Sequence, residues 1–274
     1  MFIDTSRTSF ALREDGRAWE AEFGAVYVKS QHLAVPLFDV EQLAQRKPKS
    51  WPARWVAERE HHAAVTSALR ALELRGAHFV NSVAKFEVHL LKPLQSVVLQ
   101  RAGVRVPASL TTNDAQAVRA FASEFGDVVY KTPAGGALVR RLTKEDLSAR
   151  RLAALATAPV LFQQRIEGDE FRVTMLDGVC VGAWKLPARG VVDARLVMEQ
   201  AKKVKCPAEV EKACARAAKA LGLVFTSVDV RVSDEGVPYV LECNPTPSIA
   251  SYEDARRSPV LRALARHLIE RAGS

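Results

Sequence analysis

Three oxygen-bearing side chains, Asp229, Glu242 and Asn244, come close together near the end of the chain. Glu242 and Asn244 are two residues apart, so on a β-strand both point to the same face of the sheet. A turn at Asp234–Gly236 would fold Asp229 back beside them. Two carboxylates and an amide oxygen suit Mg²⁺, which completes its octahedron with nucleotide phosphates. The alternative is a solvated hairpin face, against which the apolar residues around VLECNP argue.

The segment that would position these ligands is 225–248, which we interpret as two strands joined by a polar turn. Apolar residues alternate with polar ones on both sides of that turn. They are Val224, Val228, Val230, Val232, Val237, Tyr239 and Leu241. A period of two is typical of strands with one buried face, so the pattern predicts a β hairpin.

A second candidate group lies upstream, around Lys131. This lysine ends the apolar strand VVYK and precedes the flexible pair Gly135-Gly136. A lysine in that place can contact nucleotide phosphates while backbone N–H groups cover them. The alternative is that the glycines only make a hairpin turn.

The strand VLFQQRI adds a candidate nucleotide hinge. We expect it to be an edge strand that exposes Gln163 and the backbone from Gln164 to Ile166, which can match the donor and acceptor of adenine while Ile166 packs on the ring. Glu170 is placed to accept hydrogen bonds from ribose hydroxyls. Arg172 follows on the same strand face and can pair with a phosphate or an acyl-phosphate.

The remaining elements follow from hydrophobic periodicity and capping signals. We expect a β meander over residues 1–38, a helix that ends at Ala102 before Gly103, and a helix over 144–156 capped by Thr143. Further along, the sequence predicts a hairpin turn at Asp177-Gly178, an irregular and mobile segment over 187–206, a helix from Pro207 to about Gly222, and a last helix over 259–272.

Bulk composition limits the possible functions. The chain has 274 residues, 48% hydrophobic and 26% charged, which is ordinary for a globular protein. It shows no apolar run long enough to span a membrane and no signal peptide. The four cysteines form no CxxC pair, so neither a disulfide framework nor a zinc site is indicated, and we expect a reduced, cytoplasmic protein.

The net charge of +8 has two explanations, a solvated basic surface or a positive cleft for an anionic partner. Because no helix-turn-helix, zinc-finger or RNP-like pattern is present, we expect no nucleic-acid partner. A nucleotide triphosphate together with an acidic polypeptide would match the same charge.

Taken in order, these motifs resemble those of the ATP-grasp ligases over roughly residues 77–270. Lys92 lies eleven residues before Gly103 in GVRVP, which is similar to the family's early lysine. Lys131 resembles the second ATP lysine, QQRI resembles the hinge Q-E-x-I with Gln164 in place of Glu, and ECNP resembles the E-x-N magnesium motif.

The resemblance implies an α+β, ATP-grasp fold in which two subdomains clasp ATP. The regions would be a shortened N-terminal part, 1–80, a central subdomain, 81–160, and a C-terminal subdomain, 161–274. It also implies that a carboxylate is activated by ATP as an acyl-phosphate and then attacked by an amine or a hydroxyl.

The same resemblance implies a role for each candidate residue. Mg²⁺ would bind Asp229, Glu242 and Asn244, and Lys92 and Lys131 would hold the phosphates of ATP. Nucleotide contacts would come from Gln163, Gln164, Ile166 and Glu170. Arg172 and Lys185 would stabilise the charge that develops during the reaction.

Within the superfamily, the chain is most similar to the RimK-like ligases and, among them, to the graspetide synthetases that modify ribosomal peptides. FRVTMLDG resembles their RVTVVG strand, and Asp193-Ala194-Arg195 resembles the D-x-R element implicated in engaging an acidic core peptide. A local surface salt bridge is the alternative for Asp193 and Arg195. The chain departs from the family after the metal ligands, where NPTPS replaces NPNGQ.

Three functions are therefore weighed. The first is side-chain ester or amide formation on an acidic ribosomal peptide, with a homodimer as the expected assembly and no membrane partner. The second is ligation of amino acids or other small carboxylates, as in RimK or glutathione synthetase. The third is a grasp module that binds a peptide or nucleotide without turnover.

Overall fold

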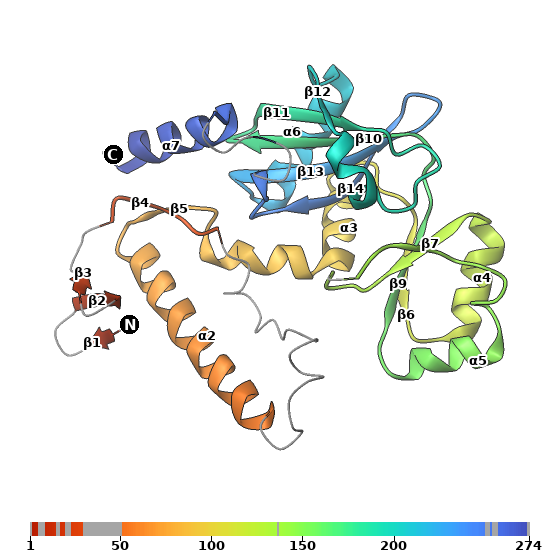
Figure 1. Cartoon of the computed structure of the whole chain (residues 1–274), viewed down its shortest axis with the longest axis horizontal. Coiled ribbons are helices and arrows are strands. Elements are labelled where there is room, and N and C mark those ends of the chain that lie inside the picture. Colours follow the sequence, from red (N-terminus) through yellow and green to blue (C-terminus); the bar gives the residue numbers. More distant parts are fainter. Residues whose placement is uncertain are drawn as a thin grey trace. The chain divides into compact units, whose positions relative to one another are not determined.

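The structure is a computed structural model, and it divides into two compact units, Met1–Phe86 with Ala265–Ser274 and Glu87–Leu264 (Figure 1). The described residues are 2–4, 9–14, 17–19, 23–29, 51–135, 137–249, 253 and 257–272. Gly136 and much of the predicted meander lie outside them. The predicted region boundaries after residues 80 and 160 stay predictions.

The first unit contains two small sheets and a long helix. Its strands β1 (Phe2–Asp4), β2 (Ser9–Glu14) and β3 (Arg17–Trp19) pair antiparallel in that order, whereas β4 (Ala25–Tyr27) pairs in parallel with β5 (His78–Val80). The meander prediction is therefore wrong for β4, because helix α2 (Trp51–Leu74) lies between the two strands in the chain and makes a parallel crossover possible. Leu72, Phe79, Val83 and Phe86 form the core of this unit.

Lys92 occupies the first position of a helix because the chain changes helix type just before it. The 3₁₀ segment η2 (Val83–Leu90) leads to Leu91, the N-cap of α3 (Lys92–Arg101). Proline at the second position of α3 lacks an N–H group that a helix start leaves unpaired in any case. The predicted helix to Ala102 is thus two pieces, and their junction positions Lys92.

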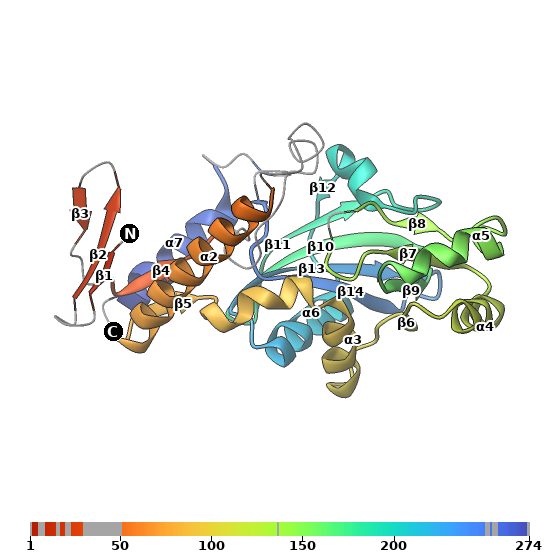
Figure 2. The same ribbon diagram turned by 90° about the horizontal axis from the view of Figure 1, so that it is seen from below.

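The second unit contains a four-stranded sheet with the order β6-β9-β7-β8 (Figure 2). Its strands are β6 (Ser109–Thr112), β7 (Val128–Lys131), β8 (Arg140–Arg141) and β9 (Val160–Gln164). Helices α4 (Ala115–Phe125) and α5 (Ala149–Leu152), followed by η3 (Ala153–Ala156), cover one face through Val118, Leu152 and Leu155. Val128 and Phe162 supply the strand side of that core, so Val129, Lys131 and Gln163 point to the other face.

The predicted helix over 144–156 is wrong in its first turn. Asp146 accepts hydrogen bonds from the backbone N–H of Thr143 at 3.0 Å and from its hydroxyl at 2.8 Å. These side-chain bonds close a turn, and the helix begins only after Ser148, its N-cap.

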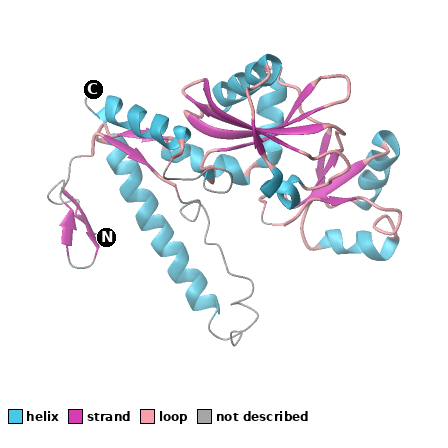
Figure 3. Cartoon of the chain, turned by 45° about the horizontal axis from the view of Figure 1, so that its top comes forward, coloured by secondary structure: helices cyan, strands magenta, loops and turns pink. Residues whose placement is uncertain are grey.

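The second sheet of this unit has five strands in the order β12-β11-β10-β13-β14 (Figure 3). The strands are β10 (Asp169–Leu176), β11 (Val179–Leu186), β12 (Lys202–Lys203), β13 (Phe225–Val232) and β14 (Pro238–Asn244). The two predicted hairpins are confirmed, because β10 pairs with β11 around Asp177-Gly178 and β13 pairs with β14.

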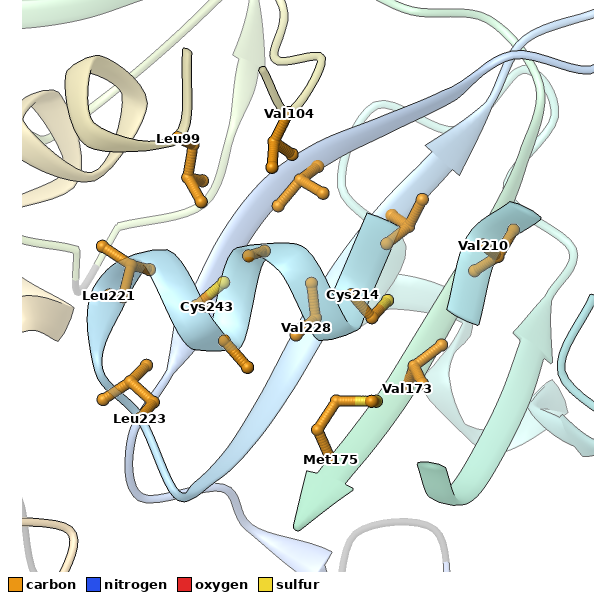
Figure 4. Close-up of a cluster of buried hydrophobic side chains, with 14 of the residues drawn as sticks. Leu99, Val104, Val173, Met175, Val210, Cys214, Leu221, Leu223, Val228 and Cys243 are labelled. Carbon is orange, nitrogen blue, oxygen red and sulfur yellow. The ribbon is translucent and has the colours of Figure 1, made fainter. Parts of the chain in front are cut away.

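One face of the five-stranded sheet is the main hydrophobic core. Helix α6 (Ala208–Leu221) lies across it, and α3 packs against α6. Figure 4 shows Cys214 of α6 above Val173, Val228 and Cys243 of the strands. Since side chains alternate along a strand, the residues between these apolar ones must point to the opposite face.

The segment 187–206 is more ordered than its composition predicts. It contains η4 (Ala194–Gln200), which Asp193 caps, and β12, which pairs with β11. Ala188 and Ala194 are buried with Leu186 in a small core of their own. The prediction of an irregular mobile loop is therefore wrong, because small apolar residues and one capping carboxylate suffice to order a short segment. The last predicted helix is confirmed as α7 (Pro259–Ala272).

Candidate active site

A cleft of about 370 Å³ lies within the second unit and is lined by residues of both its sheets. Every predicted site residue except Lys185 lines this cleft. They are Lys92, Lys131, Gln163, Gln164, Ile166, Glu170, Arg172, Asp193, Arg195, Asp229, Glu242 and Asn244. Segments that are far apart in sequence therefore meet at one place.

The floor of the cleft is the second face of the five-stranded sheet, where β10 and β13 place side chains in opposed pairs. Register sets Glu170 opposite Arg231, then Arg172 opposite Asp229, and then Thr174 opposite Ser227. Directly opposed residues of antiparallel strands share a face, so these three pairs form consecutive rungs across the floor.

The candidate metal ligands stand on two neighbouring strands of this floor. Asp229 is opposite Glu242 and Ser227 is opposite Asn244, with a bulge immediately after Asp229. Arg172 donates two hydrogen bonds to the Asp229 carboxylate, each 2.7 Å long. Lys92 donates to Glu242 at 2.5 Å. Each carboxylate is thus balanced by one cation in this structure.

The donor set fits Mg²⁺. Among the described residues no three His, Cys, Asp or Glu side chains form a metal cluster, so a metal here would depend on two carboxylates and the Asn244 amide. Hard oxygen donors of that kind match Mg²⁺, which keeps waters and takes phosphate oxygens as its other ligands. Although burial by itself raises the pKa of Glu242, the charges of Lys92 and Lys131 lower it to about 2, so this ligand is ionised at neutral pH.

Lys131 and Lys92 form the cationic wall beside these ligands. Lys131 ends β7, and burial lowers its pKa, while the negative charge of Glu242 opposes that shift. Gly135, in the loop after Lys131, has φ +88°, and a Cβ atom there would lie 3.6 Å from Cε of Lys92 and 3.7 Å from Nε2 of His89. Glycine therefore lets the backbone of this loop take a left-handed conformation close to both cleft side chains.

His89 is a cleft residue that the sequence reasoning missed. Its Nδ1 is buried and has no hydrogen-bond partner, and burial, followed by the charge of Lys92, lowers its pKa. A neutral imidazole therefore lies beside the candidate phosphate site. Its position three residues before Lys92 was the available signal, but the change of helix type between them could not be read from the sequence.

The candidate adenine hinge differs from its prediction in one respect. Strand β9 lies between β6 and β7, so the prediction of an edge strand is wrong. The N–H group of Gln164 donates to the Ala108 carbonyl at 2.8 Å, and the buried Gln163 side chain donates to Ser109 Oγ at 3.1 Å. The short extended piece before α4 supplied this second neighbour, β6.

Glu170 lies next to the hinge and pairs with Arg231, a second residue missed by the sequence reasoning. The guanidinium of Arg231 donates to Glu170 at 2.6 Å, and both side chains are buried. Burial and the nearby charge of Asp229 raise the pKa of Glu170 to about 6, against the opposing effect of Arg231. Arg231 also donates to the Ile166 carbonyl at 3.4 Å, which links this ion pair to the hinge.

Asp193 and Arg195 hold the loop after Lys131 in place. Asp193 is buried and accepts from the Val139 N–H group at 2.8 Å, while Arg195 donates to the Ala137 carbonyl at 2.7 Å. The two side chains also pair with each other at 2.6 Å. Burial alone would raise the pKa of Asp193, but these hydrogen bonds lower it. The pair therefore connects η4 to the candidate phosphate loop.

The structure does not bring Lys185 into the cleft. It is opposite Phe171, which belongs to the core face, and its ammonium pairs with Asp169 at 2.8 Å. Arg172, the neighbour of Phe171, points to the other face. A one-residue difference in strand position therefore separates Lys185 from the reacting groups, and we correct its expected placement on that ground.

Comparisons with known proteins agree with this geometry. PsnB, an ATP-grasp ligase solved with a phosphomimetic variant of a minimal precursor, Mg and ADP, is 32% identical with a TM-score of 0.77, covering 91% of this chain and 79% of PsnB. The macrocyclase MdnC from Microcystis aeruginosa MRC, bound with the precursor peptide MdnA, is 22% identical with a TM-score of 0.74, covering 94% of this chain and 82% of MdnC.

A RiPP-associated ATP-grasp ligase from Chryseobacterium gregarium, solved with ADP and a leader and core peptide, has the same fold at 17% identity and a TM-score of 0.73, with 94% of this chain and 84% of that chain covered. No curated protein matches the chain. A family of proteins described by its ATP-grasp domain matches residues 25–267. The chain has the ATP-grasp fold, as its motifs predicted, and it belongs to that ATP-grasp family.

Proposed function

We propose that the protein is an ATP- and Mg²⁺-dependent, ADP-forming ligase that activates a carboxylate of a ribosomal peptide for attack by an amine or a hydroxyl. The observation that carries this proposal is the meeting of two carboxylates, an amide oxygen and two lysines in one cleft. The PsnB structures with a minimal precursor, Mg and ADP support it, because PsnB is an ATP-grasp ligase of 32% identity.

Each cleft residue has a proposed part in this function. Lys92 and Lys131 bind phosphate oxygens, and the Gln163–Gln164 hinge with Ile166 binds the base beside the ribose-binding Glu170. Bound Mg²⁺ would neutralise phosphate charge from a site made by Asp229, Glu242 and Asn244. Because Lys92 now pairs with Glu242, nucleotide binding requires that this lysine share its donors between carboxylate and phosphate.

Arg172 is proposed to position Asp229 and to face the reacting carboxylate. Its two bonds to Asp229 fix the carboxylate plane, which a lysine could not do with a single point charge. A guanidinium held in this way is also preorganised to stabilise negative charge that develops next to the metal site. Asp193 and Arg195 act with it indirectly, since they hold the loop that follows Lys131.

The finer features of this function are also proposals. An acidic peptide suits the net charge of +8 and the cationic cleft side chains. The four cysteines are free, which agrees with a reduced cytoplasmic setting. No helix in the described part of the chain is long and apolar enough to cross a membrane. A homodimer and the division into regions 1–80, 81–160 and 161–274 complete the proposal.

The test is incubation of the protein with Mg-ATP and short acidic peptides encoded next to its gene, followed by mass spectrometry and an ADP assay. We expect a peptide to lose one water mass for each ADP released, and Glu242→Gln to abolish both. Stimulation of ADP release by free amino acids, with no change in any peptide, would instead favour a small-molecule ligase. Equal ADP release by the wild type and Glu242→Gln would contradict catalysis at this cleft.

A further inference from the structure

Three buried hydroxyl groups at one end of the cleft floor lack hydrogen-bond partners. Within the described residues, Oγ1 of Thr174, Oγ of Ser227 and Oγ1 of Thr246 are buried without a partner. The exposed fractions of the three residues are 0%, 4% and 7%. A buried hydroxyl left unpaired costs about 1–3 kcal/mol, so three in one place are unexpected unless something binds them.

The three hydroxyls are neighbours because of strand register. Thr174 and Ser227 form the rung that follows Arg172 and Asp229. On its other side Ser227 is opposite Asn244. The N–H group of Thr246 donates to Oδ1 of Asn244 at 3.0 Å, which brings this residue back to the same ligand. The group therefore adjoins the Asn244 side of the candidate metal site.

This end of the cleft is accessible and is not already used by the nucleotide residues. Ser227 and Asn244 line the cleft, as do Pro247 and Ser248, which follow Thr246. The hinge and the Glu170–Arg231 pair lie on the other side of the Arg172–Asp229 rung. Base and ribose are thus separated from the hydroxyl rung by the metal site, which leaves that rung for the second substrate.

The chemistry of the rung selects an oxyanion. Each hydroxyl can donate one hydrogen bond, and the guanidinium of Arg172 is on the adjacent rung. The two nearest carboxylates, Asp229 and Glu242, are already paired with Arg172 and Lys92. A carboxylate would find hydroxyl donors here and a cation next to them, whereas an ammonium group would meet no unpaired carboxylate among these residues.

We propose that Thr174, Ser227 and Thr246 form the subsite that binds the carboxylate to be activated, and that they set the position of its oxygens relative to the metal site. This inference rests on the proposed ligase function and adds the location of its acyl donor. It also assigns a use to the NPTPS segment, in which Thr246 provides one of the three hydroxyls.

The experiment uses N-acetyl-glutamate α-amide as the carboxylate, Mg-ATP, and hydroxylamine as the trapping nucleophile. The side-chain carboxylate attacks the γ-phosphorus and ADP leaves. The nitrogen of hydroxylamine then displaces phosphate from the acyl carbon and loses a proton, which gives a hydroxamate and inorganic phosphate. Hydroxamate and ADP are measured over a range of carboxylate concentrations and, separately, over a range of Mg-ATP concentrations.

The variants are Thr174→Val and Ser227→Ala, singly and together, because both keep the side-chain shape close to the original. We expect the half-saturating carboxylate concentration of the double variant to rise about 10-fold or more, and that for Mg-ATP to change less than about 2-fold. The variants should be at least as stable to heat as the wild type, since two unpaired buried hydroxyls are removed. Thr157→Val, at an exposed residue outside the cleft, is the control.

A binding measurement separates failure of the subsite from failure of the ligase function. Saturation-transfer NMR is recorded for N-acetyl-glutamate α-amide, its glutamine analogue and butylamine, each with the Mg-ADP form of the protein. Signals for the carboxylate alone that vanish in the double variant support the subsite even if no hydroxamate forms, and that last result would refute only the ligase activity. No carboxylate signal, a signal unaffected by the substitutions, or a preference for the amine would overturn the subsite.

Discussion

The two faces of the five-stranded sheet are built from the same strands but differ in almost every property. The face under α6 is apolar, and Val173, Val228 and Val230 are fully buried there. The cleft face carries the rungs Glu170–Arg231 and Arg172–Asp229, so opposite charges meet at hydrogen-bond distance across neighbouring strands. One alternation of side chains therefore separates stability from chemistry.

This difference explains how charged residues can be buried in a small domain. The apolar face contributes hydrophobic free energy that is not shared with the ligand site. The cleft face keeps its charges in pairs, and a pair left with one partner missing is strongly destabilising. Substitutions on the two faces should consequently affect different measurements, which gives several ways to test the comparison.

The largest effect is expected on the cleft face, from Glu242→Gln. The substitution removes a metal ligand and leaves Lys92 without its anionic partner, so ADP formation should fall by about 100-fold or more. A steady-state ADP assay checks this. Glu235→Gln, on the exposed turn between β13 and β14, is the matched control and should retain full activity. Loss of activity in the control alone would contradict the assignment.

On the core face, Val173→Ala should mainly lower the free energy of unfolding. The residue is fully buried under α6, so the lost contacts and the cavity should cost about 2–4 kcal/mol. Urea denaturation measures the change, and the half-saturating Mg-ATP concentration should stay constant at temperatures where the variant is folded. Val179→Ala, 62% exposed on the same sheet, is the control and should be nearly neutral. A large shift in nucleotide affinity with unchanged stability would break the comparison.

An intermediate effect is expected from pH, through the Glu170–Arg231 pair. The folded-state pKa of Glu170, about 6, exceeds the ordinary value of 4.5, so the folded protein holds this proton more tightly than the unfolded chain. Its contribution to the free energy of unfolding therefore falls as pH rises from 4.5 through about 6. Glu170→Gln should remove this fall, by about 2 kcal/mol, in denaturation curves recorded across that range.

The same titration should appear in nucleotide binding, with the opposite direction of benefit. Ionised Glu170 is the better acceptor for ribose hydroxyls, so wild-type affinity for Mg-ADP should weaken below about pH 6. Calorimetric titration with Mg-ADP on both sides of that pH checks it, with Glu170→Gln as the pH-independent reference. A wild-type affinity that is constant across this range would show that Glu170 does not contact the nucleotide.

The smallest effect is expected from Lys185→Ala. Its ammonium pairs with Asp169 on the core side of the sheet, and its side chain is 44% exposed, so the pair adds little stability in solvent. ADP formation should change less than about 2-fold, whereas Arg172→Ala, one rung position away on the other face, should reduce it far more. A comparable loss in both variants would mean that Lys185 reaches the reaction after all.

The sequence by itself determined the fold family and most of the cleft residues. Period-two alternation predicted the hairpins around Asp177-Gly178 and through Asp229 and Glu242, because one buried face enforces that pattern locally. The ordered series of Lys92, Lys131, the QQRI hinge and ECNP indicated an ATP-grasp ligase, and the fold and the family match confirmed it.

Only the tertiary structure decided which of these groups face one another. Register placed Arg231 against Glu170 and turned Lys185 away, and both outcomes depend on strand pairing between distant segments. The break before Lys92 brought His89 into the cleft, and β6 made the hinge strand an interior strand. Local propensity cannot specify such pairings, because each is set by the packing of the whole sheet rather than by neighbours in the chain.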